Sequence, residues 1–346
     1  MEIVFEPGIT GRQKLLINAK VRKLFPSCRM RGLGSSLLVE IPGGCRERDG
    51  SPVEALPGVA RVVWAIAESC PRARKSRRLE STSIAIGGAR LGRGTFTVIA
   101  GPCAVENEKS YLRIAAAVKA AGAQMLRGAL FKPRTSPYSF QGIGLGGLEI
   151  ILRAKKEVGL PVVTEVTDPR QLERVSRVAD ALQVGARNMR NYELLKELGR
   201  SRLPVMLKRS PHASLREWLL SAEYVLSGGN RDVFLCERGD VMASDAAPVL
   251  NFNMALRAMG STHLPVIVDP SHGTGRRAHV APLAKAAAVI GVHGIMVEVH
   301  DNPPEALSDG KQSLSLLEFS RLMEEIRAVK TSLSRRGGKS PHGNSP

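Results

Sequence analysis

The sequence predicts an α/β protein: a (β/α)8 TIM barrel preceded by a small βαββαβ domain of the ferredoxin-like type. The main observation is that, from residue 97 onward, apolar β-rich runs alternate with helical segments eight times over about 235 residues. Residues 1–66 show a shorter pattern in the order βαββαβ. A chain of 346 residues with 43% hydrophobic residues is long enough to bury both cores. A doubly wound open sheet is the structural alternative for the larger part.

The first domain, which could be regulatory, is expected over residues 1–67. Its predicted strands are 2–5, 28–33, 36–41 and 59–66, and its predicted helices are 11–24 and 52–56. The dense basic run SCPRARKSRRL follows. Residues 68–82 are therefore predicted to form a solvated linker.

The barrel is expected over residues 83–331. It begins with SIAIGGARLG, whose two apolar arms around Gly87 and Gly88 predict a hairpin that plugs the barrel floor. The predicted strands are 98–100, 124–127, 162–164, 181–184, 205–207, 233–235, 266–268 and 294–297. The predicted helices are 108–121, 146–158, 169–178, 191–199, 214–227, 245–259, 277–290 and 313–331. The remaining tail, 332–346, has almost no apolar residues and is expected to be disordered.

The net charge of +18 raises the question of nucleic-acid binding, which the position of the charge answers. Residues 1–94 carry 17 basic and 8 acidic residues, and 327–346 add 5 basic and no acidic ones. Residues 95–326 therefore retain 28 basic against 24 acidic residues and are nearly balanced. Aromatic content of 4% argues against a base-stacking surface. Nucleic acid is not the expected partner of the barrel, although the basic ends leave RNA binding open.

Cysteine usage and hydropathy are typical of a cytoplasmic enzyme. No run of eighteen apolar residues appears, and the opening MEIVFEPGIT lacks the pattern of a signal peptide, so no membrane association is expected. The five cysteines are odd in number and widely spaced, which predicts reduced thiols.

Cationic side chains follow four strands of the predicted barrel, at the C-terminal ends where such barrels place their working residues. Because these cations repel one another, their convergence indicates bound anions, namely two phosphates and a carboxylate. The stretch FKPRTSPYSFQG, 131–142, adds the hydroxyls of Thr135 and Ser136 between prolines that restrict the backbone. A salt bridge at the rim is the alternative for each cation alone. The six cations are Arg127, Lys132, Arg134, Arg187, Lys208 and Arg238.

A second group consists of Cys103, His272, Glu298 and Asp309, which follow strands one, seven and eight. These strands become neighbours when the barrel closes, so a thiolate, an imidazole and two carboxylates come within reach of one divalent ion. Mixed sulfur, nitrogen and oxygen ligands suit Mn²⁺, Fe²⁺, Co²⁺ or Zn²⁺. Each residue alone can instead be a buried thiol, a loop histidine or a salt-bridge partner. A site for two phosphorylated molecules and one Lewis acid predicts a reaction that joins them.

Eight motifs together resemble the 3-deoxy-7-phosphoheptulonate (DAHP) synthase family, the first enzymes of the shikimate pathway to aromatic amino acids. They are GPCAVE, LRGALFKPRTSPYSFQG, VTEV, QVGARN, MLKRS, LCERG, VDPSHGTGRR and VEVHDNPPEALSDGKQSL. The resemblance is greatest to type I beta members with an N-terminal ferredoxin-like module.

The resemblance implies a metal-dependent condensation of phosphoenolpyruvate with erythrose 4-phosphate, Mn²⁺ being the first choice of ion. It makes Cys103, His272, Glu298 and Asp309 the metal ligands. It assigns phosphoenolpyruvate contacts to Arg127, Lys132, Arg187, Lys208 and Arg238, and sugar-phosphate contacts to Arg134, Thr135 and Ser136. Lys132 is the candidate for protonating the new hydroxyl, and Glu165 for positioning the attacking water.

Several alternatives and partners stay open from the sequence. The nearest rival is 3-deoxy-8-phosphooctulonate synthase, which takes arabinose 5-phosphate and resembles a Lys-Ala-Asn-Arg-Ser pattern at 132–136. The resemblance also implies a homotetramer or homodimer and an aromatic amino acid effector, tyrosine or phenylalanine. Arg29 and Arg31 argue against that effector, because smaller side chains are expected to line its pocket.

Overall fold

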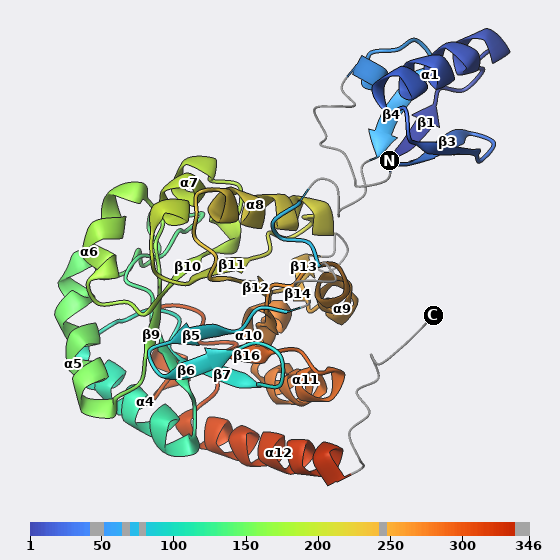
Figure 1. The fold of residues 1–346 in the computed structure, drawn as a ribbon. Coiled ribbons are helices and arrows are strands. Elements are labelled where there is room, and N and C mark those ends of the chain that lie inside the picture. The colour runs from blue at the N-terminus through green and yellow to red at the C-terminus, as the bar shows by residue number, and fades with distance from the viewer. Residues whose placement is uncertain (42–51, 64–69, 76–80, 242–247, 336–346) are drawn as a thin grey trace. The chain divides into compact units, whose positions relative to one another are not determined.

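The computed structural model describes residues 1–41, 52–63, 70–75, 81–241 and 248–335 (Figure 1). The chain divides into two compact units, Met1–Arg74 and Lys75–Pro346. Parts of the predicted linker, 68–82, and of the predicted tail, 332–346, lie outside the described residues. Within the linker, Cys70 and Ala73 are buried, so the prediction of a solvated segment is wrong at these two positions.

The smaller unit is a four-stranded antiparallel sheet with one long helix. Its elements are β1 Glu2–Phe5, α1 Gly11–Leu24, β2 Arg29–Gly32, β3 Ser36–Glu40 and β4 Val59–Val63, in the sheet order β2-β3-β1-β4. Helix α1 begins after Thr10, whose hydroxyl and backbone N–H both pair with Gln13 in a capping box. Ile17 and Val21 of this helix pack on Ile3 of the sheet. The strands and helix α1 follow one another along the chain in the predicted order, and of the predicted second helix, 52–56, residues 52–54 are helical.

The larger unit is the predicted barrel. Eight parallel strands close in the order β10-β11-β12-β15-β16-β7-β8-β9, which confirms the (β/α)8 fold and excludes the open sheet. The strands are β7 Thr97–Gly101, β8 Met125–Arg127, β9 Val162–Glu165, β10 Ala181–Val184, β11 Val205–Lys208, β12 Val233–Glu237, β15 Val266–Val268 and β16 Gly294–Glu298. Nearly every strand residue is buried, as expected for a parallel sheet covered by helices.

Helices surround the barrel (Figure 1). They are α4 Glu108–Ala121, α5 Leu148–Val158, α6 Leu172–Ser176, α7 Tyr192–Arg200, α8 Leu215–Ser227, α9 Phe252–Ser261, α11 Arg277–Ile290 and α12 Leu316–Arg335, with a short extra helix, α10 Pro270–Thr274.

Two predicted helix boundaries differ most from the observed ones. The helix predicted at 245–259 begins later, at Phe252, because β14 Pro248–Val249 pairs with β13 Asp240–Val241; residues 245–247 lie outside the described residues. The last helix reaches Arg335, so the predicted tail starts four residues too early.

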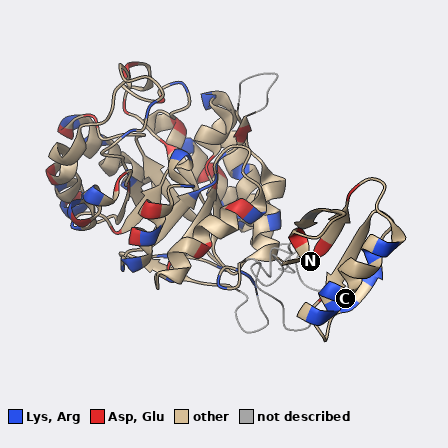
Figure 2. Cartoon of the chain, turned by 90° about the horizontal axis from the view of Figure 1, so that it is seen from above, with Lys and Arg blue, Asp and Glu red and all other residues tan. Residues whose placement is uncertain are grey.

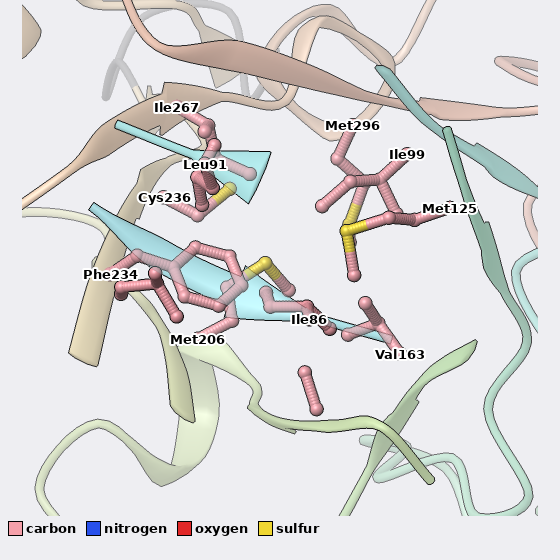
Figure 3. Packing of buried hydrophobic residues seen from close by; sticks show 12 residues of the cluster. Ile86, Leu91, Ile99, Met125, Val163, Met206, Phe234, Cys236, Ile267 and Met296 are labelled. Atoms are coloured by element: carbon pink, nitrogen blue, oxygen red, sulfur yellow. The ribbon is translucent and has the colours of Figure 1, made fainter. Parts of the chain in front are cut away.

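A hairpin closes the N-terminal end of the barrel, as predicted. Strands β5 Ile84–Ile86 and β6 Ala89–Leu91 place Ile84, Ile86 and Leu91 among the inward-facing strand residues (Figure 3). The turn at Gly87 has φ +49°, and a Cβ there would lie 2.6 Å from Pro161, just before β9. Glycine therefore allows the close approach. With the floor filled, the opposite end of the barrel is left for a site.

Charge is distributed differently over the two units. Basic and acidic residues are interspersed over the barrel (Figure 2). Helix α1 of the smaller unit carries basic residues and no acidic one. Among the described residues, no helix has the length and apolarity needed to cross a membrane.

Candidate active site

The candidate functional side chains lie at or just beyond the C-terminal ends of the barrel strands. Arg127, Glu165, Lys208 and Glu298 are the last residues of β8, β9, β11 and β16. Cys103 follows β7 by two residues, and two further residues come from later segments: His272 from α10 and Asp309 from the loop before α12. Because β16 pairs with β7 and β7 with β8, the barrel brings residues separated by up to two hundred positions together.

Cys103, His272, Glu298 and Asp309 form a compact cluster. Their ligand atoms all lie within 4.8 Å of one another. Asp309 Oδ2 lies 2.8 Å from Cys103 Sγ and 3.7 Å from His272 Nε2, and His272 Nε2 lies 3.3 Å from Glu298 Oε1. Ligands of one tetrahedral ion stand about 3.4 Å apart, so these side chains fit a divalent metal with little movement.

The backbone at Asp309 is unusual, since its φ of +58° lies in the left-handed region. Asp is among the residues that tolerate this conformation. Burial would raise the pKa of Asp309, but His272 and Lys132 lower it to about 2. The carboxylate is therefore ionised and available to a metal at neutral pH.

A network around the cluster orients its ligands. Asp269 Oδ2 lies 2.8 Å from His272 Nδ1, and Asp269 Oδ1 accepts from the backbone N–H of His272 at 2.9 Å as the N-cap of α10. The Lys208 ammonium lies 2.5 Å from Asp269 Oδ2. Burial would raise the pKa of Asp269, but His272 and Lys208 hold it well below its usual range. Because His272 Nδ1 contacts Asp269, the other ring nitrogen, Nε2, faces the cluster.

Glu298 is held from two directions. Arg127 Nη1 lies 2.9 Å from Glu298 Oε1, and both side chains are almost completely buried. Gln312 Nε2 donates to Glu298 Oε2 at 2.6 Å. Burial would lower the pKa of Arg127, but Glu298 and Cys103 raise it above its usual value, so the pair is ionic.

Lys132 and Glu165 face the same space. Lys132 Nζ donates to Cys103 Sγ at 2.7 Å and lies 4.0 Å from Asp309 Oδ2. Burial would lower the pKa of Lys132, but Cys103 and Glu165 raise it, so its ammonium keeps its proton. Glu165 is held by Gln183 Nε2 at 2.9 Å, and a Cβ at Gly185 would lie 2.1 Å from Glu165 Oε1. Glycine at 185 therefore makes room for this carboxylate.

The remaining predicted cations are more open. Arg187 is exposed, while Arg134 and Arg238 are half-buried. Thr135 and Ser136 are exposed in the loop after β8. None of the three arginines forms an ion pair with another described residue. The three guanidinium groups are therefore available to a ligand. No hydrogen bond or ion pair among the described residues links them to one another.

Two parts of the site were missed from the sequence. Asp269 stands three residues before His272, and this N-cap spacing was the available signal. The second part is a buried ion pair in which Arg209 contacts both carboxylate oxygens of Glu237 and lies 2.8 Å from Asp240 Oδ1. It joins the ends of β11 and β12 beside Lys208 and Arg238. No local pattern pairs Arg209 with Glu237, because the pairing depends on strand order.

The chain is similar to known proteins over most of its length. Residues 76–335 match the family model described as DAHP synthetase I family. The chain is 39% identical over 336 residues to a phospho-2-dehydro-3-deoxyheptonate aldolase of Thermotoga maritima, covering 96% of this chain and 98% of that one. A crystal structure of DAHP synthase from Thermotoga maritima matches with a TM-score of 0.84 at 38% identity, covering 96% and 97% of the two chains.

More distant relatives carry another name. A 2-dehydro-3-deoxyphosphooctonate aldolase of Syntrophobacter fumaroxidans is 34% identical over 257 residues, covering 69% of this chain and 88% of that one. The longer match and the higher identity both favour the heptonate enzymes. The chain belongs to the DAHP synthetase I family.

Proposed function

We propose that this protein condenses phosphoenolpyruvate with D-erythrose 4-phosphate and water to give 3-deoxy-D-arabino-heptulosonate 7-phosphate and phosphate. The observation that carries the proposal is the four-ligand cluster beside the buried cations Arg127, Lys132 and Lys208. Family membership supports the same activity. The product is the first intermediate of the shikimate pathway.

The metal would be held by Cys103, His272, Glu298 and Asp309. When bound there, a divalent ion supplies a Lewis acid for the aldehyde oxygen of the sugar. The mixed donor set suits Mn²⁺, Fe²⁺, Co²⁺ or Zn²⁺, and Mn²⁺ is our first choice. In the metal-free protein burial raises the pKa of the Cys103 thiol, and Glu298 raises it further, so metal binding should release a proton.

The anionic groups of phosphoenolpyruvate would bind the cations. Arg127 and Lys208 already have buried carboxylate partners, so they supply fixed positive potential with little reorganisation. Arg187 and Arg238 have no such partner among the described residues and would pair with the phosphate itself. Arg134, Thr135 and Ser136 would bind the phosphate of the four-carbon sugar.

Lys132 and Glu165 are the proposed acid and water-positioning group. C3 of phosphoenolpyruvate forms a bond to the aldehyde carbon, and the ammonium of Lys132 donates a proton to the former aldehyde oxygen, which becomes the new hydroxyl. Water held by Glu165 adds to C2, giving a tetrahedral carbon that bears a hydroxyl and the phosphate. The bond from C2 to the phosphate oxygen then breaks, which releases phosphate and leaves the ketone. Of the two protons that the water loses in these steps, one restores the ammonium of Lys132 and the other leaves on the phosphate.

One assay tests this function. Protein treated with EDTA should not consume phosphoenolpyruvate, and restoring Mn²⁺ or another metal of the panel should restore turnover. Erythrose 4-phosphate should be used at least about ten-fold more efficiently than arabinose 5-phosphate, since the two sugars differ in where the phosphate lies. Full activity in EDTA, or a preference for arabinose 5-phosphate, would contradict the proposal.

A further inference from the structure

The loop that carries Arg134, Thr135 and Ser136 is closed at its base by backbone contacts. Lys132 N–H donates to the carbonyl of Gln141 at 2.8 Å, and Gly144 N–H donates to that of Leu130 at 2.9 Å. Gly142 has φ +91°, and a Cβ there would lie 2.2 Å from the Leu130 oxygen. Only glycine fits this closure, which fixes where the loop leaves and rejoins the barrel.

The side chain of Gln141 reaches back across this loop. Its Nε2 lies within hydrogen-bond distance of three backbone carbonyls, those of Ser139 at 3.1 Å, Ser136 at 3.3 Å and Pro137 at 3.4 Å. The side-chain amide of Gln141 therefore contacts three backbone carbonyl oxygens in the outer half of the loop.

Little else holds the outer half of the loop. Residues 135–138 are exposed, and Tyr138 is 97% exposed, so apolar packing contributes little there. Among the described residues, two further hydrogen bonds hold this half of the loop, both made to Ser136: its Oγ accepts from Tyr138 N–H and its carbonyl accepts from Ser139 N–H, each at 3.3 Å. Because Ser136 Oγ accepts the first of these, its own proton stays free for a ligand oxygen.

We propose that Gln141 is a positioning residue for the sugar phosphate: its amide pre-orders the loop so that Arg134, Thr135 and Ser136 reach the phosphate together. The inference rests on the proposed function and adds a role for Gln141, a residue that the proposed mechanism does not use. Gln141 itself does not touch substrate in this account. Gln141 lowers the conformational entropy that the loop would otherwise lose when the sugar phosphate binds.

The test compares two variants with a control. Gln141→Met keeps the length of the side chain and removes the donor, and Gln141→Glu replaces the donor by an acceptor that repels the three carbonyls. The KM for erythrose 4-phosphate should rise about ten-fold in the first and more in the second, since a lost hydrogen bond and a new repulsion add. The kcat value and the KM for phosphoenolpyruvate should stay within about two-fold of wild type. Tyr138→Phe, which alters an exposed hydroxyl of the same loop, should change none of them.

Hydrogen exchange of the backbone amides of residues 135, 136, 138 and 139 is the second readout; Pro137 has no N–H. Exchange should become faster in both Gln141 variants and not in Tyr138→Phe. Unchanged exchange together with an unchanged KM for the sugar would overturn the role of Gln141, as would equal rises in both KM values. A wild-type protein that condenses neither sugar would refute the proposed function, whereas the exchange data would still report whether Gln141 orders the loop.

Discussion

On one side of the site the charged groups pair with one another, whereas on the other side the side chains have no charged partner among the described residues. The first, here called the buried side, comprises Arg127, Lys132, Lys208, Asp269, His272, Glu298 and Asp309. The second, the open side, comprises Arg134, Thr135, Ser136, Arg187 and Arg238, none of which forms an ion pair with another described residue.

The difference follows from the cost of burying charge. A cation at the end of a buried strand must be paired before any substrate arrives, because an isolated buried charge is strongly unfavourable. A cation on an exposed loop stays hydrated and can pair later. Substitutions on the buried side should therefore affect stability, metal binding and chemistry, while those on the open side should affect substrate binding alone.

The largest effect is expected at Lys132, the one buried-side group proposed to transfer a proton. Lys132→Met should lower kcat by about 10² to 10⁴, the usual contribution of a positioned acid. Metal affinity should change much less, because the ligands remain. Lys156→Met on α5, outside the site, is the control. A kcat within about three-fold of wild type would place the acid elsewhere.

Arg209 and Glu237, at the C-terminal ends of β11 and β12, form a buried ion pair next to Lys208 in the sequence. Arg209→Met leaves Glu237 buried without its partner and should lower the free energy of unfolding by about 3 to 5 kcal/mol. Arg177→Met removes an exposed pair with Glu173 and should cost less than about 1 kcal/mol. Denaturant unfolding of the two variants makes the comparison. Equal losses would remove the distinction between buried and exposed pairs.

Much of the barrel is predictable from local sequence, because each buried strand is a short apolar run such as Val205–Lys208. The four cluster residues could also be proposed, since closure makes strands one, seven and eight neighbours. The Arg209–Glu237 pair and the amide of Gln141 could not. Their partners are chosen by strand order and loop shape, and neither leaves a local pattern. The start of α9 was predicted too early for a similar reason. The β13–β14 pairing depends on how the chain folds back on itself and leaves no local pattern.

The orientation of His272 by Asp269 gives the next prediction. Asp269→Asn should weaken metal binding about 10- to 100-fold, as is typical when the outer partner of a ligand is lost. Competition with a chelator measures the affinity. Asp168→Asn, whose half-buried side chain contacts the exposed Arg170, serves as the control. A metal affinity within about two-fold of wild type would show that Asp269 does not influence metal binding through His272.

The smallest effect is expected on the open side. Arg187→Met should raise the KM for phosphoenolpyruvate by about ten-fold, the value of one charge-assisted contact. The unfolding free energy should stay within about 0.5 kcal/mol, because the exposed side chain has no described partner. Steady-state kinetics and denaturant unfolding check the two values. A clear loss of stability would place Arg187 on the buried side.

The division into two sides is tested most directly by measuring Arg127→Met and Arg134→Met together, each for unfolding free energy and for the KM of erythrose 4-phosphate. Arg127→Met should lose about 3 to 5 kcal/mol of stability, because the buried carboxylate of Glu298 loses its arginine partner. Arg134→Met should keep wild-type stability within about 0.5 kcal/mol and raise only the KM of the sugar. Equal stability of the two variants would contradict the account, as would a loss of stability in Arg134→Met alone.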